Sequence, residues 1–374
     1  MDIERRMRKE AALMQRPLHG GDGWRIDKVE DFSANLNPYG PPPDIAQLLT
    51  EAASSLDHYP DDSSLVLKEA AADRHDLRVE NIIPGAGSSE LIRLFPEVFV
   101  ERGDKVLMPR PTFSEYTFGC QFMGAQMVWS ELPRANGFRC DLGQLLESLD
   151  EGFKAVYLCN PNNPTGMTCP RAAITELVQE AERRNVLAFL DETLLELLPN
   201  EPELSCASLV EGHENLFIIR SLTKSFAIPG FRVGYGLGSK SMISCLEHGR
   251  QTWNLGHLEQ AVAARLIRDR QDHVTQAAEV LAQERDKTHA QLRRLGVPSL
   301  NRPDAFFFFQ DVSALGHDSR FFREAMRAAG ALVRDCASFG SPFERYVRFC
   351  VKTPEKDALL LHAWETVLEA GQEG

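Results

Sequence analysis

Short, strongly apolar runs that alternate with amphipathic stretches constrain the fold of this chain more than any other feature. Such runs are typical of strands with both faces buried, and they lie at residues 106–108, 155–159, 186–190 and 216–219. Between the second and third runs, residues 170–184 carry apolar side chains at helical spacing. Parallel strands need a crossover connection, so strand, helix and strand in this order form a βαβ unit. The sequence therefore predicts an α/β fold with a mainly parallel sheet flanked by helices.

The pattern changes near residue 256, which indicates a second, smaller α+β domain. A long helical region precedes an aromatic strand, and a helix, two short strands and a last helix follow. These features lie at residues 258–295, 305–310, 319–329, 331–334, 346–350 and beyond. The four phenylalanines at 306–309 are expected to serve packing alone. We expect an N-terminal arm at 1–35 rather than a core element, a large domain at 36–255 and a small domain at 256–374.

Composition excludes several classes of function. The net charge of −13 repels nucleic acid backbones. No apolar run approaches the roughly 20 residues of a membrane span, and the charged N-terminus lacks the apolar core of a signal peptide. The eight cysteines form no CxxC pair, so no metal site is expected. We expect a cytoplasmic protein with free thiols and no membrane or nucleic acid partner.

Polar clusters follow three of the predicted strands. Residues 160–166 read Asn-Pro-Asn-Asn-Pro-Thr-Gly, Asp191 follows the next strand, and Lys224 and Arg232 follow the third. In α/β sheets, ligands bind beyond the carboxyl ends of the strands. A lysine amine forms a Schiff base with pyridoxal 5′-phosphate (PLP), and the pyridine nitrogen of PLP needs a carboxylate partner. The pattern predicts PLP as cofactor, with Lys224 as the Schiff-base lysine and Asp191 beside the ring nitrogen.

A phosphate site is predicted at the turn that reads Gly-Ala-Gly-Ser-Ser-Glu at 85–90. A helix-like run follows it, so the backbone around Gly87 and the hydroxyls of Ser88 and Ser89 lie at a helix N-terminus, where phosphate binds well. Ser221 would add a hydroxyl and Arg232 a fixed charge.

The segment 221–235, Ser-Leu-Thr-Lys-Ser-Phe-Ala-Ile-Pro-Gly-Phe-Arg-Val-Gly-Tyr, resembles the fold-type I PLP enzymes, the class I/II aminotransferases in the broad sense. The stretch 160–166 and Asp191 occur in the order of that family, and the resemblance covers almost the whole chain. It implies that Asn163 binds the ring hydroxyl and that Phe113 stacks on the ring, with Tyr116 as second choice.

The same resemblance implies roles for residues outside these motifs. Tyr59 matches a tyrosine that reaches the cofactor phosphate of the neighbouring subunit, which implies a homodimer with shared active sites. Arg348 matches the arginine that clamps the substrate carboxylate.

Two branches of the family resemble this chain most, and the N-terminal arm favours one. His-Gly-Gly at 19–21, followed by Asp-Phe-Ser-Ala-Asn-Leu-Asn-Pro at 31–38, resembles the threonine-phosphate decarboxylases of cobalamin biosynthesis. That likeness implies that His19, Gly20 and Asn35 recognise the substrate. The segment 332–336 likewise implies that Arg334 contacts the substrate phosphate.

Leu194 departs from the usual aminotransferase pattern, which has a tyrosine at this position that donates to the ring hydroxyl. The departure favours decarboxylation of a small phosphorylated amino acid, O-phospho-L-threonine, to (R)-1-amino-2-propanol O-phosphate. The alternatives are an aminotransferase for histidinol phosphate or a related amino acid and, in another class, a PLP-binding regulator without activity. The arm is too short for the DNA-binding module of such a regulator.

Each candidate residue also has a simpler interpretation. Lys224 alone would be a solvated lysine, and Asp191 alone would be a helix cap. Arg334 and Arg348 could form structural ion pairs, and a histidine in an arm, such as His19, is often only solvated.

Overall fold

The computed structural model describes residues 3–17, 19–21, 23–298, 300–316 and 318–372. Its large sheet has the strand order β2-β8-β7-β6-β5-β3-β4. These strands are β2 (Ile82–Gly85), β3 (Lys105–Arg110), β4 (Gln126–Glu131), β5 (Phe153–Cys159), β6 (Leu187–Asp191), β7 (Leu216–Ser221) and β8 (Gly234–Gly238). Strand β8 runs antiparallel to both its neighbours, and the other pairs are parallel. The predicted α/β fold with a mainly parallel sheet is confirmed.

The sheet lies between two apolar layers, because alternate residues of each strand point to opposite faces. Phe189 packs in the layer formed with α4 (Ser88–Phe99), α5 (Ser114–Phe122) and α10 (Lys240–Glu247). Leu190, the next residue, packs in the layer formed with α3 (Leu65–His75), α6 (Leu142–Ser148), α7 (Arg171–Arg183) and α11 (His257–Asp269). The predicted strands are therefore buried on both faces, and the helix expected at 170–184 is α7.

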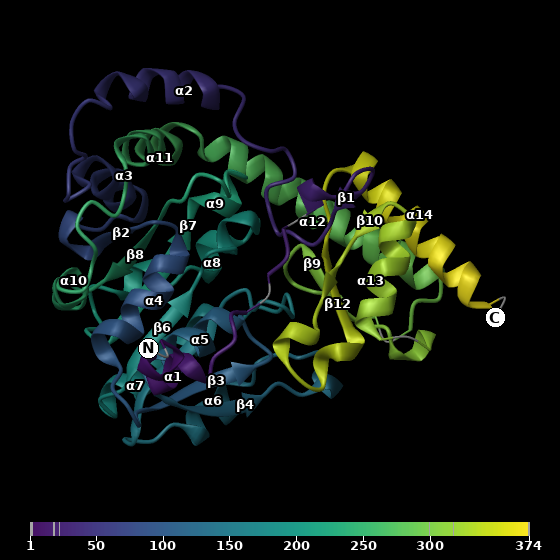
Figure 1. Ribbon diagram of the computed structural model, residues 1–374, viewed down its shortest axis with the longest axis horizontal. Coiled ribbons are helices and arrows are strands. Elements are labelled where there is room, and N and C mark those ends of the chain that lie inside the picture. The colour runs from purple at the N-terminus through teal and green to yellow at the C-terminus, as the bar shows by residue number, and fades with distance from the viewer. Residues whose placement is uncertain (1–2, 18, 22, 299, 317, 373–374) are drawn as a thin grey trace.

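The C-terminal part folds around a smaller antiparallel sheet, order β11-β12-β9, on the right of Figure 1. Its strands are β9 (Phe307–Asp311), β11 (Arg334–Asp335) and β12 (Tyr346–Cys350). Helices α12 (Gln271–Arg294), α13 (Ser319–Ala328) and α14 (Pro354–Gln372) pack around it. The phenylalanines at 306–309 are buried, as expected from their packing role.

The helical region expected at 258–295 is two helices that meet at Arg270. Arg270 leaves the helical conformation with φ −132°, and its Nε donates to the Asp44 carboxylate at 3.1 Å. Helix α11 packs on α3 and on α2 (Ile45–Ala52), whereas α12 packs on α14. The break thus lets one continuous region serve both parts of the molecule.

The end of the N-terminal arm belongs to the core of the small part. Strand β1 (Glu30–Asp31) pairs in parallel with β10 (Ala331–Leu332), and the next residue, Phe32, is fully buried. The expectation that 1–35 is no core element is therefore wrong for its last residues. A partner three hundred residues away leaves no local sequence signal.

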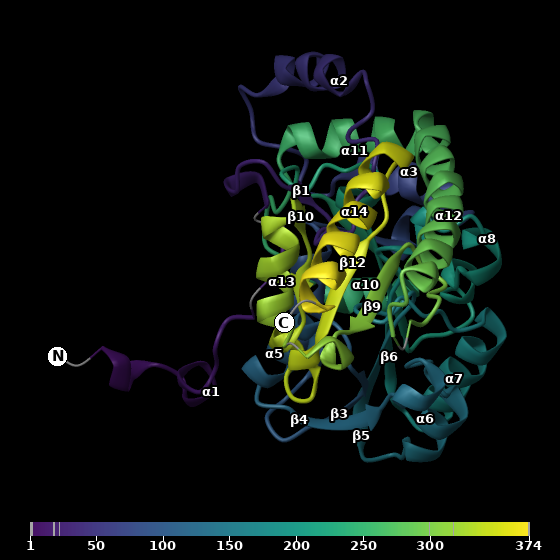
Figure 2. The ribbon, with the colours of Figure 1, turned by 90° about the vertical axis from the view of Figure 1, so that its right-hand side faces the viewer.

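The start of the arm, unlike its end, lies outside the core. Its short helix α1 (Lys9–Ala12) and the turn at Glu4–Arg6 project from the body in Figure 2. Among the residues that the structure describes, no helix combines the length and the apolar character needed to cross a membrane.

Candidate active site

The polar clusters predicted to share a site meet at the carboxyl ends of neighbouring strands. Asp191 is the last residue of β6 and Ser221 the last of β7, and Lys224 lies in the single turn α9 (Leu222–Ser225) that follows. The backbone N–H of Asn160, just past β5, donates to the Asp191 backbone carbonyl at 2.8 Å.

Lys224 is partly buried beside two cations. Burial lowers the pKa of its amine to about 8, the charges of Arg348 and Arg232 act in the same direction, and the Asp191 charge opposes them. Within the described residues, the Lys224 amine makes no hydrogen bond. The neutral amine, which is the nucleophilic form, is therefore well populated near pH 8.

Asp191 is buried and its two carboxylate oxygens have separate partners. The Thr193 amide donates to Oδ1 at 2.8 Å and the Tyr116 hydroxyl donates to Oδ2 at 2.5 Å. Burial raises the pKa of Asp191, and these two hydrogen bonds oppose the shift. Asp191 ends a strand and points its carboxylate toward Tyr116, so the helix-cap interpretation does not hold.

A cradle for an anion lies at the N-terminus of α4. Gly87 has φ +73°, and a Cβ on it would come within 2.5 Å of Arg232 Nη2. Arg232 also donates to Ser89 Oγ at 3.3 Å, and Ser88 follows Gly87 at the helix start. Backbone amides, a hydroxyl and a guanidinium converge here, and they fit the phosphate of PLP. Ser221 was predicted to join them, but its hydroxyl pairs with Thr223 Oγ1 at 2.8 Å.

The opposite wall of the site comes from the small sheet. Arg348 is buried, and its Nη1 donates to Asn163 Oδ1 at 2.6 Å while its Nη2 donates to the Ser33 carbonyl. Arg334 stands directly opposite Arg348 in the β11–β12 ladder, so both side chains leave the same face. Arg334 donates to Ser338 Oγ at 2.8 Å. Burial lowers the pKa of Arg348, and the charge of Arg334 acts in the same direction.

The arm brings further predicted residues to the site, His19 beside α5 and Gly20 beside Arg334. His19 Nε2 lies 2.6 Å from Glu115 Oε1, and its ring centroid is 5.6 Å from that of Phe113. A Cβ on Gly20 would lie 3.4 Å from Arg334 Cδ. Asn35 is buried, and neither polar atom of its amide has a partner among the described residues. An orphaned buried amide is costly, so it marks a place where a polar ligand fits.

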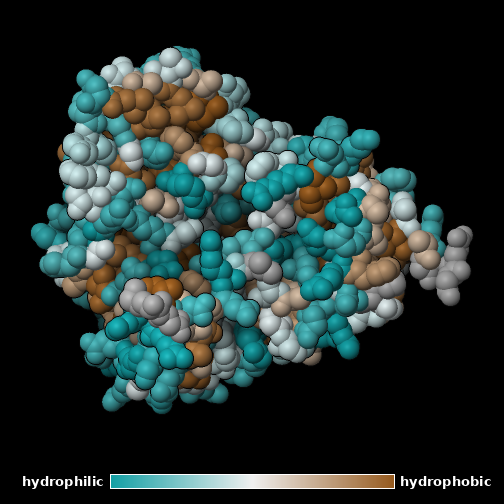
Figure 3. Space-filling view, in the orientation of Figure 1, coloured by the Kyte–Doolittle hydropathy of each residue, from teal (hydrophilic) through white to brown (hydrophobic). Residues whose placement is uncertain are grey.

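Tyr59 is not brought to the other predicted residues. Its side chain is 74% exposed and stacks on Trp253, with ring centroids 4.3 Å apart. An exposed aromatic pair of this kind is typical of a protein contact. Apolar side chains also gather over α2 at the top of Figure 3.

Sequence reasoning missed the contacts that orient these residues. Tyr116 was the second choice for ring stacking, but its hydroxyl reaches Asp191, and its ring meets Phe113 edge-on at 77°. Its spacing of three from Phe113 could have indicated a shared site. Ser33 and Glu115 had no signal, because their partners lie far away in the sequence.

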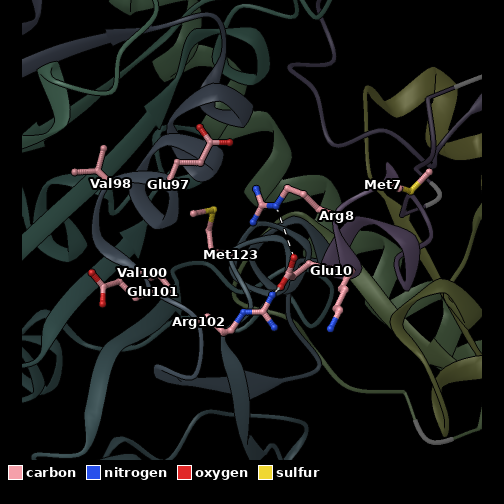
Figure 4. A pocket seen from close by; sticks show the side chains of 10 residues that line it. Met7, Arg8, Glu10, Glu97, Val98, Val100, Glu101, Arg102 and Met123 are labelled. Atoms are coloured by element: carbon pink, nitrogen blue, oxygen red, sulfur yellow. Dashed lines mark ion pairs between the residues drawn. The ribbon is translucent and has the colours of Figure 1, made fainter. Parts of the chain in front are cut away.

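A hollow near the N-terminus lies apart from this site. It has a volume of about 780 Å³ and lies between the arm and the ends of α4 and α5, where Arg8 and Arg102 both pair with Glu10 (Figure 4). None of the predicted site residues lines it. A second hollow of about 450 Å³ reaches Ser114, next to Phe113, and Ser338, the partner of Arg334.

Comparison with known proteins identifies the family. A family model for aminotransferase class I and II matches residues 27–363. A protein of Caldanaerobacter subterraneus subsp. tengcongensis, provisionally named a threonine-phosphate decarboxylase, is 32% identical over 97% of both chains. Histidinol-phosphate aminotransferase of Moorella thermoacetica is 31% identical over 92% of this chain and 86% of its own.

Solved structures share the fold. Histidinol-phosphate aminotransferase of Sinorhizobium meliloti, in complex with PLP, has a TM-score of 0.85 at 21% identity and covers 98% of both chains. L-threonine-O-3-phosphate decarboxylase of Porphyromonas gingivalis has a TM-score of 0.80 at 22% identity, over 91% of this chain and all of its own. With 337 of 374 residues inside the family model, the chain belongs to the class I and II aminotransferase family and is a PLP-dependent enzyme.

Proposed function

We propose that this enzyme decarboxylates O-phospho-L-threonine to (R)-1-amino-2-propanol O-phosphate, a precursor for the nucleotide loop of cobalamin. The pairing of Arg334 with Arg348 on one face of the small sheet carries the proposal. Two like charges side by side favour a ligand with two anionic groups. Phosphothreonine offers a carboxylate and a phosphate. The provisional name of the Caldanaerobacter relative supports the same substrate.

The cofactor residues proposed from the sequence fit this arrangement. Asp191 would hold the pyridine nitrogen, and Gly87, Ser88, Ser89 and Arg232 the phosphate. Ser221 would contribute through its paired hydroxyl.

Asn163 would bind the ring hydroxyl with its amide nitrogen, because its Oδ1 already accepts from Arg348. Leu194 is buried and apolar, which leaves Asn163 without the second donor of a typical aminotransferase. Phe113 would cover the ring.

Bound PLP supplies an electron sink for the bond that breaks at the substrate Cα. Arg348 and Arg334 would bind the two anionic groups of the substrate, and their positions would orient its Cα toward the cofactor. Loss of the carboxylate as carbon dioxide would leave its bonding electrons on Cα, where the cofactor would take them up. Lys224 then returns a proton to Cα, for which its lowered pKa is suited. His19, Gly20 and Asn35 would enclose the substrate from the arm.

The alternative function is transamination of histidinol phosphate. The Moorella aminotransferase is almost as similar as the decarboxylase relative. The same two arginines would accept the two carboxylates of 2-oxoglutarate.

We also propose a homodimer in which Tyr59 reaches the cofactor phosphate of the neighbouring subunit. Its exposure and its stacking on Trp253 support a contact surface at this position. The proposed location is the cytoplasm, where the eight free cysteines stay reduced.

An assay of the purified enzyme separates the two reactions. With phosphothreonine, the proposal predicts carbon dioxide release that needs no 2-oxoglutarate. Glutamate formation from histidinol phosphate and 2-oxoglutarate, without carbon dioxide from phosphothreonine, would establish the alternative instead.

A pair of variants tests the substrate contacts. Arg334→Gln removes a charged donor worth about 1.5–3 kcal/mol, so KM for phosphothreonine should rise roughly 10- to 100-fold. Arg327→Gln, on the exposed face of α13, is the matched control and should leave KM unchanged. Equal KM values for the two variants would remove Arg334 from the substrate site.

A further inference from the structure

Two aromatic residues lie at the N-terminal end of α5. Phe113 stands at the start of the helix, and Tyr116 follows one turn later with its side chain fully buried. The Tyr116 ring packs against Tyr157 and Phe189, each with ring centroids 5.8 Å away. These contacts hold the ring in place, with its hydroxyl facing Asp191 and Cys159.

The Tyr116 hydroxyl donates to Asp191 Oδ2 at 2.5 Å. The Thr193 amide binds the other oxygen at 2.8 Å. A carboxylate oxygen has room for a second donor, so Asp191 keeps a free position for a further N–H. The carboxylate is thereby held in one orientation before any ligand arrives.

The protonation of the pair follows from its surroundings. Burial, together with the Asp191 charge, raises the pKa of Tyr116 well above its usual value, so the hydroxyl keeps its proton and remains a donor. Burial also raises the pKa of Asp191, and the Tyr116 hydrogen bond is the largest influence against that rise. A donor on Oδ2 therefore favours the ionised carboxylate that a pyridinium N–H requires.

We propose that Tyr116 is a positioning residue, whose hydroxyl keeps Asp191 ionised and oriented toward the pyridine nitrogen of PLP. Tyr116 acts through Asp191 and touches neither the substrate nor the reacting atoms. The inference rests on the proposed pairing of Asp191 with the ring nitrogen, and it holds for decarboxylation and transamination alike.

The structure offers a matched control in the same aromatic cluster. Tyr157 is equally buried, and its hydroxyl accepts only from the Cys120 thiol, at 3.4 Å, among the contacts within the described residues. Tyr157→Phe and Tyr116→Phe remove the same atom from neighbouring rings. A general effect of losing a buried hydroxyl would appear in both variants.

The test measures dissociation constants of two ligands for the apoprotein: PLP, and a PLP analogue with carbon in place of the ring nitrogen. Tyr116→Phe should weaken PLP binding roughly 10- to 100-fold, as expected for a lost hydrogen bond to a charged group. It should leave analogue binding within about twofold. Tyr157→Phe should change neither. Both ligands carry the same phosphate on a ring of the same shape, so a general loss of stability cancels in the ratio of the two constants.

Three other outcomes overturn the inference. Tyr116→Phe that weakens both ligands equally would show a structural role, and no change for either ligand would show no role. The variant Asp191→Asn tests whether Asp191 binds the ring nitrogen at all. If this variant keeps the wild-type preference for PLP over the analogue, Asp191 does not hold the nitrogen. In that case the proposed cofactor contact fails together with the role of Tyr116.

Discussion

The amine of Lys224 lies where burial and two arginine charges all favour its neutral form. Its pKa is lowered to about 8, so the nucleophilic amine is gained as pH rises through 8 rather than through its usual 10.5. The rate at which apoprotein captures PLP, followed by absorbance, should rise with pH and level off above about 9. Lys240→Ala, at an exposed lysine, should keep this profile. A rate that still climbs beyond pH 10 would contradict the assignment.

A substitution at Gly87 tests whether the cofactor phosphate binds at the N-terminus of α4. A Cβ there would meet Arg232 Nη2 at 2.5 Å, whereas Gly103 has a similar positive φ (+92°) and open space around it. Both Gly→Ala changes strain the backbone, by an amount on the order of 1 kcal/mol. Only Gly87→Ala should also weaken PLP binding, by at least about tenfold. Titration of the two variants with PLP is the measurement, and equal affinities would show that the cofactor phosphate lies elsewhere.

The sequence predicted the residues that local motifs place at strand ends, such as Lys224 and Asp191. It could not predict contacts that depend on the packing of distant segments. The Ser33 carbonyl on Arg348 joins positions 315 residues apart, and the Tyr116 hydroxyl on Asp191 joins positions 75 apart. No pattern within either segment encodes such a meeting.

Strands β6 and β7 are also joined on the face of the sheet opposite Asp191. Arg220, one residue before Ser221, lies 2.5 Å from Glu192 in a fully buried ion pair and 3.0 Å from Glu201, whose side chain is largely buried. Burial raises the pKa of Glu192, and the Arg220 charge opposes that rise. This cluster connects the end of β6, which carries Asp191, with the end of β7, which leads into the turn of Lys224.

Removal of the arginine should therefore cost much more than the loss of a surface pair. Arg220→Met leaves buried carboxylates without their cation and should lower the free energy of unfolding by about 3–5 kcal/mol. Arg265→Met, at an exposed position of α11, breaks surface ion pairs with Asp269 and Glu51 and should cost no more than about 1 kcal/mol. Urea denaturation of both variants measures the difference. Similar midpoints would mean that the cluster does not stabilise the fold.

Strands that are apolar throughout were predicted correctly, whereas a segment whose residues pair with two different sheets was not. Strands β5, β6 and β7 were predicted from their composition. The single strand expected at 331–334 is instead β10 and β11, which pair with different sheets. The antiparallel β8 was missed, because Gly234, Gly236 and Gly238 give it no β-branched alternation.

In the proposed dimer, two subunits contribute to each active site. If Tyr59 serves the neighbouring subunit, Tyr59→Ala and Lys224→Ala damage different copies of a shared site. A mixed dimer should regain one intact site, because one subunit supplies Lys224 and the other supplies Tyr59. Activity of the co-refolded mixture should exceed that of either variant alone.

The mixed-dimer experiment needs two controls. Sedimentation must show the dimer, and a mixture of two Lys224→Ala preparations must stay inactive. A mixed dimer no more active than its parents would place Tyr59 in the site of its own subunit or outside any site.

The proposed chemistry depends on Lys224 as the residue that carries PLP. Borohydride reduction of the PLP-loaded enzyme fixes the bond between cofactor and lysine, and trypsin does not cleave after a modified lysine. Mass spectrometry should then find residues 221–232 as one peptide that carries a pyridoxyl phosphate. A pyridoxyl phosphate on any other lysine, or none on the protein, would contradict the account.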